Sequence, residues 1–169
     1  LAQYWLGDTL VEEGQIEQGW LHCRQALDAA QQNHQAEGNS PTALQDVSMC
    51  LSRLGDLEQD AGRPERARLI YEEALKLDQQ IRAQLGDQPR TLRDVSFSLG
   101  RLADLAHEAG RREHARTMYE ESLSLKQQIR TTWGDQPETL RDVSVSLERL
   151  AGLEREAGRP EQARLMYEH

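Results

Sequence analysis

Cysteine and long apolar runs are scarce in this chain, and each shortage excludes a class of protein. Its 169 residues include two cysteines, Cys23 and Cys50, which are too few for a disulfide framework and favour a reducing compartment. No stretch approaches the roughly 20 apolar residues that cross a bilayer, and no basic segment precedes an apolar one as in a secretory signal. We therefore predict a cytoplasmic protein with no membrane partner.

Basic residues are also outnumbered. The sequence has 20 lysines and arginines against 29 aspartates and glutamates, which gives a formal net charge of -9. Binding to nucleic acid needs a concentrated basic surface whose contacts with phosphates release counterions. We predict no nucleic-acid partner for a chain with this excess of acidic residues.

Motifs of common enzyme chemistry are missing as well. The five histidines are scattered, and the sequence contains no HExxH, CxxC or GxSxG pattern and no glycine-rich phosphate loop. Cys23 and Cys50 fall at positions that we interpret as packing positions of helices. The sequence therefore predicts a protein that is not an enzyme, with no catalytic residue, no cofactor and no metal site.

The chain does contain one unit that recurs every 48 residues. Asp94–Gly110 returns as Asp46–Gly62 and as Asp142–Gly158, and segments 41–88 and 89–136 are identical at more than half of their positions. Such self-similarity predicts a repeat array in which each unit is buried by its neighbours. We expect a single array within a larger bacterial multidomain protein. It divides into a diverged repeat, two full repeats and a truncated repeat, at 1–40, 41–88, 89–136 and 137–169.

Glycine and proline predict where two helices begin and end in each unit. Glycines recur just after apolar runs, where a left-handed residue commonly ends a helix. Prolines such as Pro89 recur at the first helical position, which needs no amide hydrogen. Between them, apolar residues such as Leu92, Val95 and Leu99 are spaced three and four apart, which predicts one buried helix face. We predict helices at 1–13, 16–36, 41–61, 64–85, 89–109, 112–133, 137–157 and 160–169.

The two helices of each unit, called helix A and helix B, resemble the tetratricopeptide repeat. Helix A carries Leu102-Ala103 at the family's close-packed pair, and helix B carries Ala115-x3-Tyr119 at its Ala-x3-aromatic position. Both pairs recur in the other copies. The 48-residue unit, longer than the family's roughly 34 residues, indicates a long-helix variant. The resemblance implies an all-α, right-handed α-solenoid of antiparallel helix pairs, with about three and a half repeats.

The resemblance also implies a function. In this family the A helices line a concave groove that binds peptides, so we predict a non-catalytic protein–protein interaction scaffold whose partner is a peptide or helix of another protein. Positions that differ between copies are free of the stacking constraint and can carry specificity. The predicted partner-binding residues are Tyr4, Trp5, Asp8, Met49, Ser52, Arg53, Asp56, Phe97, Gly100, Arg101, Asp104, His107, Val145, Arg149 and Arg155.

Two alternatives stay open from the sequence. The arginines that persist in the groove, Arg53, Arg101 and Arg149, could hold carboxylates of a partner. The alternative is an internal pair with an aspartate three residues along the same helix, which the sequence offers to Arg53 and Arg101 but not to Arg149, where Gly152 replaces the acid. The array as a whole is either a binding scaffold or a structural module that associates end to end with other copies through apolar faces.

One aspartate recurs near the start of every helix A. A residue present in each copy usually serves the stacking that is common to all copies. We therefore expect this carboxylate to hydrogen-bond near the helix start or in the turn of a neighbouring unit. The residues concerned are Asp46, Asp94 and Asp142.

Overall fold

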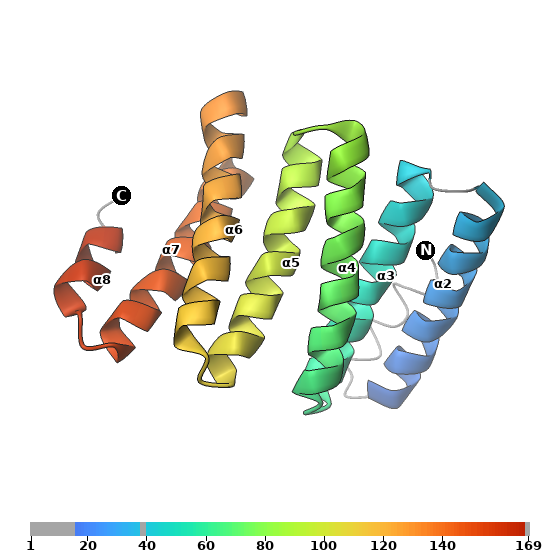
Figure 1. Cartoon of the computed structure of the whole chain (residues 1–169), viewed down its shortest axis with the longest axis horizontal. Coiled ribbons are helices and arrows are strands. Elements are labelled where there is room, and N and C mark those ends of the chain that lie inside the picture. The colour runs from blue at the N-terminus through green and yellow to red at the C-terminus, as the bar shows by residue number, and fades with distance from the viewer. Residues whose placement is uncertain (1–15, 38–39, 168–169) are drawn as a thin grey trace. The chain divides into compact units, whose positions relative to one another are not determined.

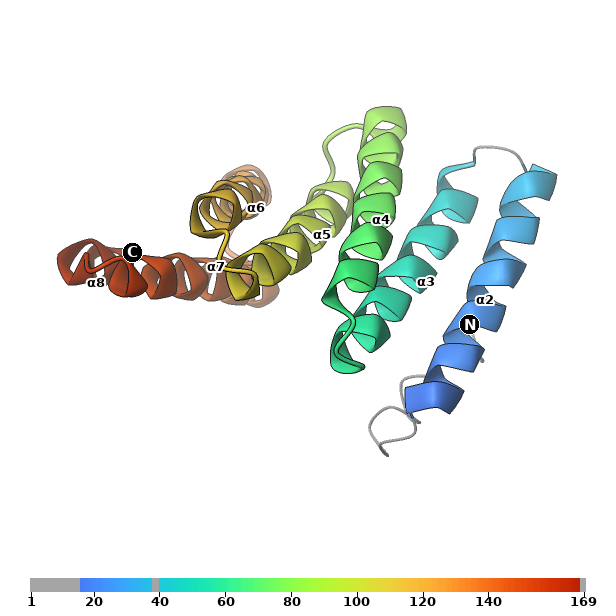
Figure 2. The ribbon, with the colours of Figure 1, turned by 60° about the horizontal axis from the view of Figure 1, so that its bottom comes forward.

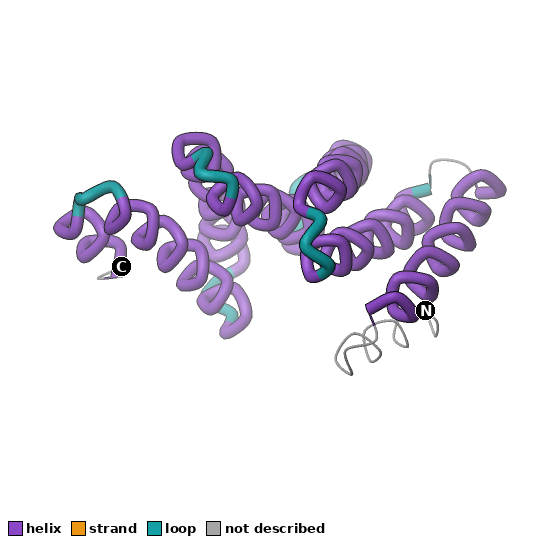
Figure 3. The backbone as a smooth tube through the Cα atoms, turned by 90° about the horizontal axis from the view of Figure 1, so that it is seen from below, coloured by secondary structure: helices purple, strands orange, loops and turns teal. Residues whose placement is uncertain are grey.

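The protein is built from helices joined by short turns (Figure 1). The structure is a computed structural model that describes residues 16–37 and 40–167. Over these ranges it contains helices and loops but no strand, which confirms the predicted all-α class (Figure 3). Two compact units divide the chain, Leu1–Gly86 and Asp87–His169, and we call them unit 1 and unit 2.

Unit 1 contains three of the described helices. They are α2 (Ile16–Glu37), α3 (Pro41–Asp60) and α4 (Pro64–Leu85), and α3 packs against both of the others (Figures 1 and 2). Their ends agree with the predicted ends to within a few residues. The helix predicted at 1–13 lies outside the described residues.

Unit 2 contains two helix pairs. The first is α5 (Pro89–Glu108) with α6 (Arg112–Trp133), and the second is α7 (Pro137–Glu156) with α8 (Pro160–Tyr167). Helix α6 also packs against α7, so each helix of this unit is covered by the next one along the chain. This is the stacking of antiparallel pairs that the repeat predicted.

The turn between helix A and helix B has the same hydrogen bonds in every described copy. In unit 1, the amide of Gly62 donates to the carbonyl of Gln59 at 2.9 Å, and the amide of Arg63 donates to the carbonyl of Glu58 at 2.8 Å. Gly62 has a φ of 70°, a left-handed conformation that costs glycine little. This pair of bonds is the Schellman motif, and it confirms the predicted glycine cap.

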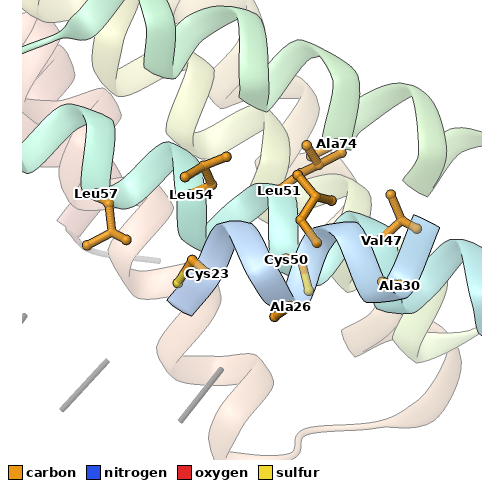
Figure 4. Packing of buried hydrophobic residues seen from close by; sticks show 10 residues of the cluster. Cys23, Ala26, Ala30, Val47, Cys50, Leu51, Leu54, Leu57 and Ala74 are labelled. Carbon is orange, nitrogen blue, oxygen red and sulfur yellow. The ribbon is translucent and has the colours of Figure 1, made fainter. Parts of the chain in front are cut away.

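Apolar residues of all three helices form the core of unit 1. Figure 4 shows Cys23, Ala26 and Ala30 of α2 against α3, with Ala74 entering from α4. Both cysteines are buried in this core and form no disulfide with each other, which confirms their interpretation as packing residues. Burial, and next the charge of Asp46, raises the pKa of the Cys50 thiol to about 11, so the reactive thiolate is disfavoured.

The packing of helix A on helix B depends on one small residue and one aromatic residue. The Tyr71 ring of α4 lies so close to Gly55 of α3 that a Cβ at residue 55 would overlap it. In unit 2, Tyr119 of α6 is buried in a cluster with Ala103, Ala106 and Ala115. These are the close-packed pair and the aromatic position that the sequence predicted. Trp133, the last residue of α6, is exposed although it is large and apolar.

Candidate functional site

The predicted groove residues of unit 1 lie on α3 and are half-buried. Arg53 Nη1 is 4.0 Å from Asp56 Oδ2, one turn along the same helix. The Tyr71 hydroxyl donates to Asp56 Oδ1 at 2.7 Å. Met49 and Ser52 lie beside them on α3. Tyr4, Trp5 and Asp8 lie outside the described residues.

The predicted groove residues of unit 2 come from two neighbouring A helices, α5 and α7. On α5, the Phe97 side chain is exposed, Gly100 is buried, and Arg101, Asp104 and His107 are half-buried. On α7, Val145 and Arg155 are exposed and Arg149 is half-buried. Within unit 2, the structure brings Asp104 together with Arg149, and His107 with α7.

Arg149 joins the two helices at the centre of this set. Its Nη2 atom lies 2.9 Å from Asp104 Oδ2 on α5, and its guanidinium carbon lies 5.8 Å from the centre of the Tyr119 ring. A Cβ on Gly100 would lie 3.3 Å from Arg149 Nη1, so the absence of a side chain there lets the guanidinium approach α5. This arginine therefore pairs internally, but across two repeats rather than along one helix.

Asp104 also anchors helix B of its own repeat. The Tyr119 hydroxyl donates to Asp104 Oδ1, as Tyr71 does to Asp56 in unit 1. Burial, and next the hydrogen bond to Asp104, raises the pKa of the Tyr119 phenol above its usual range. The phenol therefore stays neutral and donates its proton throughout the physiological range.

Lys126 of α6 is buried near Phe97, and it was not among the residues predicted from the sequence. Its side chain is 2% exposed, although it carries an ammonium group. The Nζ atom donates to Ser146 Oγ of α7 at 2.8 Å and lies 5.5 Å from the centre of the Phe97 ring of α5. Burial lowers the pKa of the amine from 10.5 to about 8.

A signal for Lys126 was present in the repeat. The segments Leu77–Arg82 and Leu125–Arg130 differ at one position only, where unit 1 has Asp78 and unit 2 has Lys126. Asp78 is buried too, and it accepts a hydrogen bond from Ser48 of α3. A charge reversal inside an otherwise identical run could therefore have identified this position.

Ion pairs hold the two ends of α5 against α7. Near the helix starts, Arg93 lies 3.4 Å from Asp142, so this aspartate pairs with the neighbouring repeat. Near the helix ends, His107 Nε2 lies 2.9 Å from Glu156 Oε2. That contact, followed by the charges of His107 and Arg112, lowers the pKa of the Glu156 carboxyl.

A buried glutamate joins helix B of one repeat to the following turn. Glu154 of α7 pairs with Arg116 of α6 and with Arg159 after its own helix. The bond from Arg159, and then the charge of Arg116, lowers the pKa of Glu154 below 4.5. Glu58 has the same place in unit 1 and accepts a 2.7 Å bond from the indole nitrogen of Trp20.

The described residues hold no group of three or more histidines, cysteines or acids placed to bind a metal ion. None of the helices in the described part of the chain is long and apolar enough to cross a membrane. The predicted groove residues thus lie in two sets, one on α3 of unit 1 and one on α5 and α7 of unit 2, and each set contains both polar and apolar side chains.

Comparison with known families agrees with this geometry. Two models of the tetratricopeptide repeat match the sequence, one at residues 47–79 and the other at residues 98–129. The chain contains tetratricopeptide repeats. Both matches begin inside helix A and end inside helix B. The extra length of each 48-residue repeat therefore lies in the outer ends of its two helices and in the turn to the next repeat. This location agrees with the long-helix variant predicted from the sequence.

Solved structures of low sequence identity share the fold of this chain. BtubC (BKLC) from P. vanneervenii has a TM-score of 0.75 at 18% identity over 98% of this chain, which spans 59% of the BtubC chain. TPR-like repeats of a Podosopora anserina kinesin light chain give 0.67 at 17% identity, covering 98% of this chain and 70% of that one. The designed helical repeat protein DHR64 gives 0.51 at 22% identity, covering 95% and 86%. A comparison with curated proteins gave no match.

Proposed function

We propose that this tetratricopeptide array is a non-catalytic scaffold that binds a segment of a partner protein. The observation that carries the proposal is the surface of unit 2 around Phe97. Phe97 and Val145 occupy equivalent positions of α5 and α7, and both are exposed although they are large and apolar. The same two helices carry the polar residues Asp104, His107 and Arg149 further along their length. An exposed apolar pair with a polar rim is typical of a peptide-binding surface.

Differences between copies support the same surface. Position 97 is phenylalanine where the other full repeat has Met49, and position 100 is glycine where that repeat has Ser52. The stacking residues beneath, such as Leu54 and Leu102, are the same. Variation at an exposed position such as 97, above stacking residues that are the same, is where specificity can differ between repeats.

A random peptide display library tests this function. The immobilised chain should select peptides with a shared pattern, and the most enriched peptide should bind the chain in solution. Phe97→Asp should weaken that peptide about tenfold or more, since a buried aromatic anchor often contributes over 1 kcal/mol. Leu69→Asp is the matched control, because Leu69 is exposed on α4 of unit 1. Selection of no peptide, or equal loss in both variants, would contradict the proposal.

Exposure at α7 favours a second candidate, self-association. Leu140 is 38% exposed, whereas the equivalent Leu44 and Leu92 are 1% and 0% exposed. The helices B that follow α3 and α5 have 22 residues each, whereas the described part of α8 is Pro160–Tyr167. We propose that a second copy covers this face of α7. Sedimentation velocity should then show a dimer that Leu140→Glu converts to monomer, and a monomer at all concentrations rules the candidate out.

We also propose a setting for the array. Its two buried cysteines, which form no disulfide with each other, suit the reducing cytoplasm. The array would serve as the repeat region of a larger bacterial multidomain protein, divided into repeat units at 1–40, 41–88, 89–136 and 137–169. Protein partners, rather than nucleic acid, fit the net charge of -9.

A further inference from the structure

The ammonium group of Lys126 has no counter-ion. Its one hydrogen bond goes to the neutral hydroxyl of Ser146, and its other near neighbour is the face of Phe97. No ion pair joins it to a carboxylate in the part of the chain that the structure describes. A buried charge without a paired opposite charge lowers the stability of a fold, often by several kcal/mol.

The acidic groups nearest to Lys126 are already engaged. Asp104 of α5 binds Arg149 and Tyr119, and Asp142 of α7 binds Arg93. Their charges favour the ammonium form, whereas burial and the charge of Arg149 disfavour it. The groups facing Lys126 from α5 and α7 are thus two paired acids and one paired base, and the amine keeps an unmatched positive charge.

The fold does not require a cation at this position. Unit 1 places Asp78 at the equivalent site of α4 with the same flanking residues, and its helices pack in the same order. A polar residue that weakens packing and that the repeat does not need is expected to serve binding.

We propose that the surface of unit 2 recognises a carboxylate side chain of the partner segment, with Lys126 as the residue that determines this specificity. The proposal rests on the scaffold function above. The aromatic ring of Phe97 lies next to the amine and is 38% exposed, so it reaches solvent where Lys126 itself does not. A carboxylate seated at the edge of this ring enters a poorly solvated site, where attraction to an unpaired ammonium is stronger than in water.

Binding also changes the protonation of Lys126. A carboxylate within about 4–6 Å favours the charged amine and raises its pKa again. Lys126 should therefore take up protons from solution when an acidic peptide binds above pH 8. The affinity of the peptide should fall as the pH rises past about 8, the pKa of Lys126 in the free protein.

Paired peptides test the proposal on the whole chain. Peptides selected from the random display library are synthesised as twins, one with glutamate and one with glutamine at each acidic position. Wild-type protein should bind the acidic twin about tenfold or more tightly at pH 7, which is 1.4 kcal/mol. Lys126→Met should lose this preference while still binding the amide twin. Lys76→Met is the matched control, because the sequence has two lysines and Lys76 is exposed on α4.

Each outcome decides one of the two proposals. If peptides bind but Lys126→Met keeps the acidic preference, the carboxylate site is wrong and the scaffold function stands. If no peptide binds, both are wrong. If Lys76→Met loses the preference for the acidic peptide equally, the preference comes from the overall charge of the protein, and the assignment to Lys126 is wrong. A thermal melt of Lys126→Met, expected at or above the wild-type midpoint, shows that the variant is folded.

Discussion

The two units of the array differ most at one buried position. In unit 1, Asp78 of α4 accepts a hydrogen bond from Ser48, which belongs to helix A of the same repeat. In unit 2, Lys126 of α6 donates to Ser146, which belongs to helix A of the next repeat. The flanking residues along the helix are the same, and both sites are almost closed to solvent. The repeat therefore dictates that this position is buried, but it does not dictate the sign of the charge.

Other buried polar contacts are shared by the units. Tyr71 and Tyr119 each donate to an aspartate on helix A, and Glu58 and Glu154 each accept from helix B of the preceding repeat. The tyrosine contacts form a framework common to the two full repeats, whereas the glutamate contacts recur in α3 and α7 but not in α5, where Ala106 takes the place of the acid. Lys126 and Phe97 differ from their counterparts in unit 1, and they are the part available for recognition.

The largest effect should come from the framework. Tyr71→Ala and Tyr119→Ala each remove a fully buried aromatic ring, so each should lower the free energy of unfolding by about 3–5 kcal/mol. Chemical denaturation monitored by circular dichroism measures both. Tyr119→Phe is the control that keeps the ring and removes only its bond to Asp104, at a cost of about 1 kcal/mol. If the alanine variants lose less than about 1 kcal/mol of unfolding free energy, the tyrosines are not a common framework.

The same substitution should act in opposite directions at the differing position. Lys126→Met removes an unpaired buried charge and fills its place with an apolar chain, so it should raise the free energy of unfolding by about 1–3 kcal/mol. Asp78→Met leaves the Ser48 hydroxyl without this acceptor and should lower it by about 1 kcal/mol. Denaturation of the two variants side by side measures the contrast. If both substitutions change the free energy of unfolding in the same direction, the proposed distinction between the units is wrong.

The pH dependence sharpens the contrast further. Because the folded-state pKa of Lys126 is about 8 and its ordinary value is 10.5, the unfolded chain binds more protons than the folded one between these values. Stability contributed by this group therefore rises as the pH increases from about 8 to 10.5. The advantage of Lys126→Met over wild type should shrink across this window when denaturation is repeated at each pH. An advantage that grows with pH contradicts the assignment.

The smallest effect is expected at Gly100. An added Cβ would meet the flexible end of Arg149 at 3.3 Å, so Gly100→Ala should displace the guanidinium at a cost below about 1 kcal/mol. The same change at Gly55 of unit 1 meets the rigid ring of Tyr71 and should cost more. Denaturation compares the two. A larger cost at Gly100 than at Gly55 would mean that Arg149 cannot move.

Most of the fold could be predicted from the sequence because its signals are local. Gly62 and Pro64 mark a turn through their backbone preferences, and the spacing of Leu92, Val95 and Leu99 marks a buried face. The exposure of Trp133 was not predictable in this way, since it depends on where α6 ends relative to its neighbours.

The candidate site was predictable only in part. Phe97 and Arg149 follow from the resemblance and from differences between copies. The partner of Arg149 did not, because Asp104 lies 45 residues away and on another helix, whereas the sequence offered only pairs along one helix. Lys126 was missed because a lysine within an apolar run usually reaches solvent, and its burial depends on how α6 lies against α5 and α7.

Titration of the Lys126 side chain by nuclear magnetic resonance tests the central claim most directly. With two lysines in the sequence, the Lys126 signal is assigned by its disappearance in Lys126→Met, and exposed Lys76 provides the second signal. An unpaired, buried ammonium predicts half-protonation near pH 8, and a higher value once an acidic peptide is bound. A Lys126 signal that titrates at the ordinary 10.5 in the free protein would show that the amine is solvated or paired, and would contradict the account.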